Sequence, residues 1–234
     1  MILQKNRFRI HGEGQDGRSA VEQAIPQPWT GKRLFDLVLG SLCLVLLSPV
    51  LATGALMVRL TSPGPALFRQ VRLGRDSRPF VLYKFRTMYD GSSSEVHREY
   101  VRKLLTDAEP PTGGRQGLYK LEDDSRVTPF GRLLRRSSID ELPQLFNVIR
   151  GEMSLVGPRP ALPWEAELMV RTHANRFHVV PGLTGLWQVS GRSRLTMRQA
   201  LDLDVDYARR QSLLFDLLIL IKTVPAVLAT HDAS

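Results

Sequence analysis

The sequence predicts a mainly helical α+β fold for a monotopic membrane protein, whose N-terminal helix enters the lipid from one face and returns to it. Three observations predict this class. Residues 37–58 are apolar and uncharged, with a proline near the middle and basic residues on both sides. Residues 66–88 alternate like the two strands of a small β-hairpin. Most of the remaining chain has the spacing of amphipathic helices, which this class places at the membrane interface.

The charge of the chain indicates an anionic partner. Its net charge is +9 and its isoelectric point is about 10.2, which fits lipid headgroups, nucleotides or nucleic acid. The sequence contains no nucleic-acid-binding motif with stacking aromatic residues, so we expect membrane lipids and a nucleotide, and no nucleic acid. The single cysteine, Cys43, excludes an intrachain disulfide.

Residues 1–31 are polar and rich in glycine, with the segment HGEGQDGRSA at 11–20. Such a composition offers too little apolar surface to form a packed core. We therefore expect a flexible N-terminal tail.

Residues 37–58 are long enough to cross a membrane, but two features oppose a simple crossing. As a straight helix they would reach roughly 33 Å, against a hydrocarbon core of about 30 Å. Pro49 removes one helix hydrogen bond and clashes with the preceding turn. Basic residues also stand at both ends, with Lys32 and Arg33 before the stretch and Arg59 after it, whereas a spanning helix carries its positive charge on one side.

A re-entrant membrane helix over 32–60, broken at Ser48-Pro49, resolves this conflict, because both of its basic ends then lie on one face. We expect Ser48 to donate a hydrogen bond to a carbonyl that the proline leaves free. The alternative is an ordinary kinked single span, which would place the rest of the chain on the opposite side of the membrane.

A basic β-hairpin is predicted directly after the apolar stretch. Residues 66–74 and 80–88 alternate in polarity, and a glycine-containing turn joins them. We expect Lys84 and Arg86 to point toward lipid headgroups or substrate. The alternative is a basic surface hairpin with no ligand.

Four further segments are predicted to be helical. Residues 92–107 form an exposed polar helix that precedes a loop at 109–116, and residues 162–177 form a helix with Glu165 on its solvent side. Residues 201–207 form a structural helix. Residues 213–229 are strongly apolar but contain two charges and a proline, which favours a helix lying in the membrane interface over a second span.

The stretch 124–160 carries the candidate chemistry. Thr128-Pro129 is a typical helix start, and Ser138 followed by Glu141 fits a capping box. The adjacent acids Asp140 and Glu141 lie between two groups of arginines. Acids in a first helical turn are often only capping residues. Clustered arginines indicate bound anions, however, so the alternative is a site for a metal ion and a phosphate-bearing substrate.

Several ordered motifs from about residue 32 to the C-terminus resemble one family. They are DSRVT at 124–128, Arg135, DELPQ at 140–144, Asn147, GEMSLVGPRP at 151–160 and PGLTG at 181–185. They resemble the bacterial sugar transferases, the monotopic phosphoglycosyl transferases that make polyprenyl-diphosphate-linked sugars. The chain lacks the additional N-terminal membrane helices of larger members, so it resembles the small single-domain form.

The resemblance implies a reaction and its residues. Asp140 would attack the β-phosphate of a UDP-sugar, UMP would leave, and the sugar phosphate would pass to polyprenyl (undecaprenyl) phosphate. Catalysis would rest on Asp140 and Glu141, with Glu141 binding Mg²⁺. Substrate phosphates would be held by Arg135, Arg159, Lys84, Arg86 and Arg192. The family also has a Ser-Pro pair at the bend of its re-entrant helix and a Lys-Arg pair at its start, which Ser48-Pro49 and Lys32-Arg33 match.

Residues 61–234 would then be a catalytic domain on the cytoplasmic face of a bacterial inner membrane. The reaction would be the first membrane step of capsule, exopolysaccharide, O-antigen or glycoprotein assembly. The residues alone leave two other functions open, a magnesium-dependent membrane phosphatase or hydrolase and a non-catalytic lipid-binding adaptor. The sugar, the polyprenol length and a homodimer are also left open.

Overall fold

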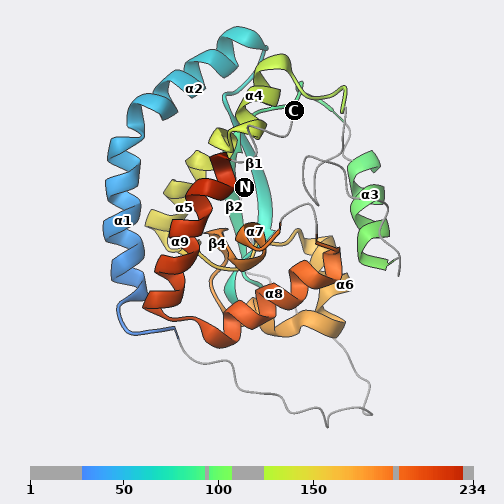
Figure 1. Cartoon of the computed structure of the whole chain (residues 1–234). Coiled ribbons are helices and arrows are strands. Elements are labelled where there is room, and N and C mark those ends of the chain that lie inside the picture. The colour runs from blue at the N-terminus through green and yellow to red at the C-terminus, as the bar shows by residue number, and fades with distance from the viewer. Residues whose placement is uncertain (1–27, 93–94, 107–123, 192–194, 229–234) are drawn as a thin grey trace, which may run out of the picture.

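The computed structural model describes residues 28–92, 95–106, 124–191 and 195–228, and it is mostly helical with two small sheets (Figure 1). This confirms the predicted α+β class. The tail over residues 1–27, the predicted loop at 109–116 and Arg192 lie outside the described residues.

The helices are α1 (Lys32–Leu46), α2 (Ser48–Thr61), α3 (Glu95–Thr106), α4 (Pro129–Arg136), α5 (Leu145–Arg150), α6 (Pro163–His173), α7 (Leu186–Val189), α8 (Met197–Arg210) and α9 (Leu213–Leu228). Short 3-10 segments are η1 (Arg75–Ser77), η2 (Ile139–Gln144) and η3 (Ala174–His178).

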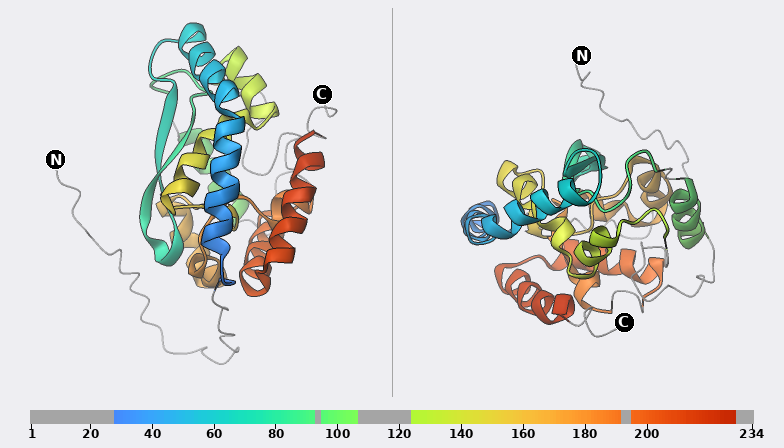
Figure 2. Two further views of the ribbon diagram at one scale, coloured as in Figure 1. Left: turned by 90° about the vertical axis from the view of Figure 1, so that its left-hand side faces the viewer. Right: turned by 90° about the horizontal axis from the view of Figure 1, so that it is seen from above.

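The predicted hairpin is confirmed. Strands β1 (Leu67–Leu73) and β2 (Pro79–Phe85) pair antiparallel, with Phe68 opposite Lys84. Because side chains alternate along a strand, Phe80 and Leu82 enter one apolar cluster and Phe85 enters another. The hairpin therefore packs against the helices through these residues and lies along one edge of the molecule (Figure 2).

The second sheet joins two of the motifs that carry the family resemblance. Strands β3 (Ser154–Val156) and β4 (Gly182–Thr184) pair in parallel. Gly157 donates to the carbonyl of Thr184 at 2.9 Å, and Gly182 donates to the carbonyl of Pro158 at 2.8 Å. A Cβ on Gly157 would collide with the carbonyl oxygen of Val180, so this backbone contact requires glycine.

The apolar stretch is broken where the sequence predicts. Helices α1 and α2 meet at Leu47, and the bend between the two helices is 59°. Pro49 has no N–H for the carbonyl of Val45, and Ser48 Oγ donates to that same carbonyl at 2.7 Å. Among the described residues no single helix has the length and apolar composition of a membrane span, and only the bent pair meets both criteria when its halves are taken together.

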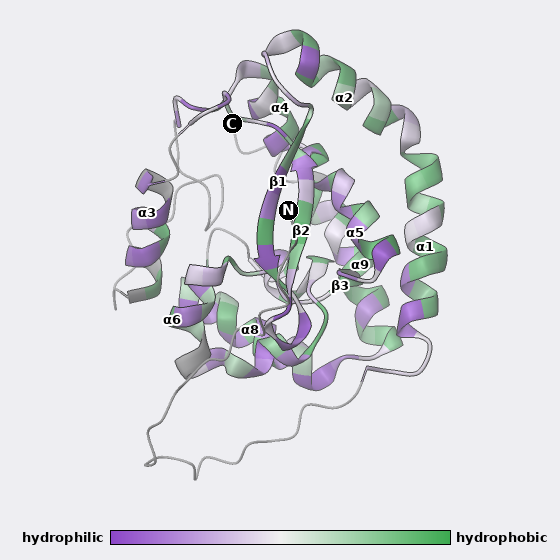
Figure 3. Cartoon of the chain, turned by 180° about the vertical axis from the view of Figure 1, so that it is seen from behind, coloured by the Kyte–Doolittle hydropathy of each residue, from purple (hydrophilic) through white to green (hydrophobic). Residues whose placement is uncertain are grey.

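Two helical surfaces carry exposed apolar side chains. One lies on α1 and α2 and the other on α9, which stand on the same side of the molecule (Figures 2 and 3). These exposed residues are Leu34, Val38, Leu42, Val45, Leu46, Val50, Leu56 and Leu60 on the bent pair, and Leu213, Leu214, Leu217, Leu218, Ile221 and Val224 on α9. Apolar patches of this kind mark surfaces that contact lipid or another protein.

The capping box predicted at Ser138 is wrong. Ser138 has a φ of 57° and its side chain makes no capping hydrogen bond. Pro143 lacks the N–H that an α-helix would donate to the carbonyl of Ile139, so the chain forms the 3-10 turn η2 and the α-helix begins only at Leu145. The two acids therefore lie on a tight turn between α4 and α5.

Candidate active site

Asp140 and Glu141 lie on η2, which packs against strand β2. Asp140 is buried and Glu141 is half-buried. A buried carboxylate stays charged only when cations or hydrogen-bond donors surround it. The cations and hydrogen-bond donors around Asp140 and Glu141 therefore decide whether these carboxylates stay charged.

Lys84 brings a cation from β2 to the acid pair. Part of its surface remains accessible to solvent, yet burial lowers the pKa of Lys84 from 10.5 to about 8. The charges of Asp140 and Glu141 raise this pKa, whereas those of Arg72 and Arg135 lower it. All four groups thus act electrostatically on one ammonium.

Arg135 is supplied by the last turn of α4. Its Nε donates to Thr87 Oγ1 at 2.9 Å, and burial lowers the pKa of Arg135 against the opposing effect of Asp140. Thr87 also fixes the helix itself, since its carbonyl accepts from the backbone N–H of Thr128 at 3.0 Å. Thr128 in turn caps α4 by accepting from Gly131 at 2.9 Å, which confirms the predicted helix start.

Arg159 follows β3 and lies beside the carboxylate of Glu165, whose burial the sequence analysis does not predict. Glu165 was predicted on the solvent side of its helix, but it is fully buried. Its Oε2 lies 3.5 Å from Arg159 Nη1 and 3.6 Å from Arg72 Nη1. It is buried because it accepts from the N–H of Leu162 at 2.8 Å and faces two guanidinium groups.

Arg72 is a site neighbour that the sequence reasoning missed. It is buried on β1, and its charge acts on Lys84. The alternation of side chains along the strands could have indicated this position. Arg72, opposite Phe80, lies on the same face of the hairpin as Lys84, which is opposite Phe68.

Arg86 is held at the turn between α2 and β1. Its Nη2 donates to the carbonyl and Oγ of Ser62 at 2.7 and 2.8 Å. The guanidinium also packs on Gly64, whose φ of 112° and close approach both exclude a side chain there. These contacts fix the turn, so a phosphate role for Arg86 stays a prediction.

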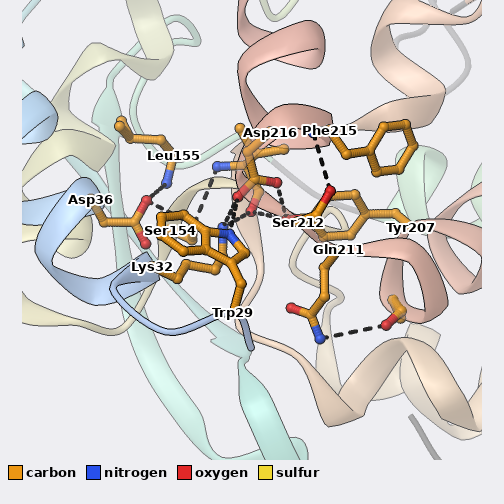
Figure 4. Close-up of polar contacts among 12 residues, drawn as sticks. Trp29, Lys32, Asp36, Ser154, Leu155, Tyr207, Gln211, Ser212, Phe215 and Asp216 are labelled. Atoms are coloured by element: carbon orange, nitrogen blue, oxygen red, sulfur yellow. Dashed lines mark hydrogen bonds and ion pairs between the residues drawn. The ribbon is translucent and has the colours of Figure 1, made fainter. Parts of the chain in front are cut away.

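Lys32 and Arg33 fasten α1 to the rest of the protein. Lys32 Nζ donates to Asp216 Oδ2 at 2.7 Å, and the indole of Trp29 donates to the same oxygen at 3.0 Å (Figure 4). Tyr207 Oη lies 2.7 Å from Asp216 Oδ1. Arg33 binds the carbonyls of residues 148 and 149 at the end of α5, both at 2.6 Å. Both residues thus bind protein groups, and the membrane-anchor role predicted for Lys32 and Arg33 stays a prediction.

The acid pair offers oxygen ligands for a divalent cation. Within the described parts of the chain, no group of three or more His, Cys, Asp or Glu side chains is arranged to hold a metal by itself. Mg²⁺ commonly takes one or two carboxylates and completes its shell with water and substrate phosphate. Asp140 and Glu141 fit that partial set.

Comparison with known proteins identifies the family. The family model described as bacterial sugar transferase matches residues 27–230. The chain belongs to this family.

Named relatives are similar over most of the chain. It is 40% identical over 196 residues to the exopolysaccharide production protein ExoY of Sinorhizobium fredii, with 84% of each chain covered. It is 42% identical over 210 residues to the UDP-glucose:undecaprenyl-phosphate glucose-1-phosphate transferase of Caulobacter vibrioides, covering 86% of this chain and 71% of that one. It is 38% identical over 203 residues to the undecaprenyl-phosphate galactose phosphotransferase of Salmonella typhimurium, of which it covers 41%.

Proposed function

We propose that this protein is a phosphoglycosyl transferase that moves a sugar-1-phosphate from a UDP-sugar to undecaprenyl phosphate and releases UMP. Two of its relatives are named for transfers of glucose-1-phosphate and galactose phosphate involving undecaprenyl phosphate. The observation that carries the proposal is the buried Asp140, on which Lys84 and Arg135 both act electrostatically. A carboxylate among cations suits an attack on a phosphate whose negative charge those cations offset.

In the first step a carboxylate oxygen of Asp140 attacks the β-phosphorus of the UDP-sugar. The bond from that phosphorus to the bridging oxygen breaks, and UMP leaves with the bridging oxygen and its electron pair. The sugar phosphate is then linked to Asp140 as an acyl phosphate. Lys84 and Arg135 hold the phosphate oxygens, and no proton is required for UMP to leave.

In the second step a phosphate oxygen of undecaprenyl phosphate attacks the same phosphorus. The bond to Asp140 breaks, which regenerates the carboxylate and yields undecaprenyl diphosphate sugar. Covalent catalysis of this kind divides one displacement into two easier ones.

Glu141, with Asp140, would hold Mg²⁺. The bound ion would offset part of the charge of the diphosphate. The residues of the chain itself position the phosphate and supply the nucleophile.

The acceptor is a lipid, so the site must lie at a membrane surface. We propose that α1 and α2 form a re-entrant helix, since their basic residues stand at both ends and their bend is built by Pro49 and Ser48. The exposed apolar face of α9 rests in the interface of the same membrane. Because basic flanks favour the cytoplasmic side, we propose that the catalytic domain lies on the cytoplasmic face of the bacterial inner membrane.

The pathway is proposed to be the first membrane step in the assembly of a surface polysaccharide. Relatives named for exopolysaccharide production and galactosyl transfer support this proposal. The sugar itself must be found by assay.

The proposal is tested with a panel of UDP-sugars, Mg²⁺ and undecaprenyl phosphate in detergent. We expect UMP release with at least one sugar, together with a lipid-linked product, and loss of both in Asp140→Asn. Release of free sugar phosphate without a lipid product would instead show a hydrolase. Activity that survives in Asp140→Asn, with deamidation excluded by mass spectrometry, would overturn the assignment of the nucleophile.

A further inference from the structure

Asn147 is a fully buried polar residue of α5 that the proposed mechanism does not use. Its Oδ1 accepts from the N–H of Tyr83 at 3.2 Å, and its Nδ2 donates to the carbonyl of Val81 and to Glu152 Oε2, both at 2.7 Å. Tyr83 requires an acceptor on one side of the amide and the two oxygens require a donor on the other, so these partners fix the orientation of the amide. The side chain thus joins α5 to strand β2.

The two backbone groups that Asn147 binds lie on the edge of β2 that faces away from β1. Along an antiparallel strand, backbone groups point alternately toward the partner strand and away from it. The carbonyl of Val81 and the N–H of Tyr83 bind Asn147, so they belong to the outward set. A shift of β2 by one residue would present groups that pair with β1 instead, and both bonds would be lost. Asn147 therefore fixes the register of β2 on α5.

A second contact between α5 and β2 fixes the rotation of the strand. Arg150 Nη1 donates to Tyr83 Oη at 2.9 Å, and the guanidinium lies 5.3 Å from the centre of that ring. Neighbouring side chains point to opposite faces of a strand. The face on which Arg150 holds Tyr83 therefore decides the direction of the next side chain, Lys84.

The other end of this connection is the acid pair. Helix α5 begins at Leu145, directly after the turn η2 that carries Asp140 and Glu141. Leu145 shares an apolar cluster with Leu82 of β2, but apolar contacts are non-directional, whereas a hydrogen bond requires one geometry. The polar contacts of α5 with β2 thus set where Lys84 lies relative to the two acids, whose charges act on it.

Burial of an amide is unfavourable unless its hydrogen bonds are made, and a buried polar group with all its partners specifies one arrangement of the chain. We propose that Asn147, assisted by Arg150, is a positioning residue that fixes β2 on α5 and thereby holds the ammonium of Lys84 beside the acid pair. The inference rests on the proposed function, in which Lys84 holds an oxygen of the transferred phosphate.

The test is Asn147→Leu, a side chain of similar size that makes none of these hydrogen bonds. We expect kcat/KM for the donor at pH 7 to fall about tenfold or more, since a small displacement of a catalytic group is costly. Instability alone also lowers activity, so the deciding readout is the pKa of Lys84. Burial is the main cause that lowers this pKa to about 8, so the pKa of a displaced Lys84 should rise toward 10.5.

The pKa of Lys84 is measured without substrate by acetylation with acetic anhydride over a series of pH values, followed by mass spectrometry of the peptide that contains Lys84. Only the neutral amine reacts, so the yield follows deprotonation. The charged groups that act on this amine are Asp140, Glu141, Arg72 and Arg135. Asn147→Leu alters none of them, so a rise in the pKa reports a displacement.

A matched control is Val148→Ala, at the next position of α5. Val148 is fully buried, and its side chain faces Gly40 of α1. We expect a lower melting temperature and an unchanged pKa of Lys84. The inference is overturned if this pKa stays at its wild-type value in Asn147→Leu, or if it changes equally in the two variants.

Tyr83→Leu keeps the test decisive should Asn147→Leu not fold. It removes the ring and the hydroxyl that Arg150 holds, at a half-buried position and without a change of charge at neutral pH. We expect a smaller rise in the pKa of Lys84, because the amide of Asn147 still binds the strand. No rise in this variant would overturn the inference.

The labelling needs no turnover, so it separates this inference from the proposed function. If the pKa of Lys84 rises in Asn147→Leu and not in Val148→Ala, while no sugar supports UMP release by wild type, the positioning stands and the reaction class falls. If wild type releases UMP and the pKa is the same in wild type and Asn147→Leu, the inference falls and the proposed function stands.

Discussion

Two polar clusters inside the protein are built on opposite principles. The helix lock, which we define as Trp29, Lys32, Tyr207 and Asp216, joins one cation to one carboxylate with hydrogen bonds of 2.7 to 3.0 Å. The acid-pair site, which we define as Lys84, Arg135, Asp140 and Glu141, gathers groups whose charges act on one another, and burial there lowers the pKa of Lys84 to about 8. Lys32 and Asp216 of the lock are buried, whereas Lys84, Arg135 and Glu141 of the site each keep part of their surface accessible to solvent. This accessibility distinguishes a cluster that a phosphate can reach from one that fastens a helix.

The largest effect on activity should come from removing a cation of the site. Arg135→Met is expected to lower kcat/KM for the donor by about a hundredfold or more, because positioning and charge stabilisation dominate phosphoryl transfer. Steady-state UMP release checks this. The matched control is Arg136→Met, the exposed next residue of α4, which should retain activity. Equal losses in the two variants would remove the distinction between a site arginine and a surface one.

A change in the lock should act on stability. Lys32→Met leaves Asp216 buried without its cation, and breaking a buried pair in this way costs about 3–5 kcal/mol. We expect a lower denaturation midpoint in detergent, with turnover per folded molecule close to that of wild type. If Lys32→Met instead lowers turnover and leaves the midpoint unchanged, the lock is part of the site and the comparison fails.

The titration of Lys84 should separate activity from stability. Protonated Lys84 binds phosphate, so kcat/KM for the donor should fall as the pH rises through about 8, the pKa of Lys84 in the free enzyme. Because this pKa is below its ordinary value of 10.5, the unfolded state binds more protons between those values, and the contribution of Lys84 to stability rises with pH in that window. Lys84→Arg keeps the charge, so the loss of kcat/KM near pH 8 should vanish. A pH profile of Lys84→Arg identical to that of wild type would assign the titration to another group.

The smallest effect should come from the helix break, where one polar contact lies outside both clusters. Ser48→Ala removes the hydrogen bond to the carbonyl of Val45 and should cost about 1 kcal/mol, since Pro49 still enforces the bend. Thermal unfolding in detergent checks this, with Ser48→Thr as the variant that keeps a hydroxyl. A loss as large as that of Lys32→Met would show that the bend, and not the lock, holds the helix in place.

The features that the sequence predicts correctly depend on neighbouring residues. The hairpin follows from alternation, the start of α4 from Thr128 and Pro129, and the partner of Ser48 from the missing N–H of Pro49. The start of α4 and the contact of Ser48 are fixed within about four residues, and the hairpin pairs two strands that follow each other directly in the chain, so local patterns can express all three.

The features that the sequence misses depend on distant partners or on competing local signals. Lys32 bonds Asp216, 184 positions away, and Arg72 bonds the carbonyl of Pro160, 88 positions away. No local pattern specifies such pairs, so burial of Glu165 between two arginines was not predicted. At Ser138 the spacing favours a capping box, but Pro143 prevents the helix that the box would begin.

The covalent intermediate on Asp140 is the central claim, and it is tested most directly by mass spectrometry after incubation with the donor sugar and Mg²⁺ in the absence of acceptor. The account predicts a sugar phosphate on the peptide that contains Asp140, formed together with UMP and lost when undecaprenyl phosphate is added. The adduct should be absent in Asp140→Asn. UMP that appears only when the acceptor is present, with no adduct at any time, would show direct transfer between the two substrates and would contradict the account.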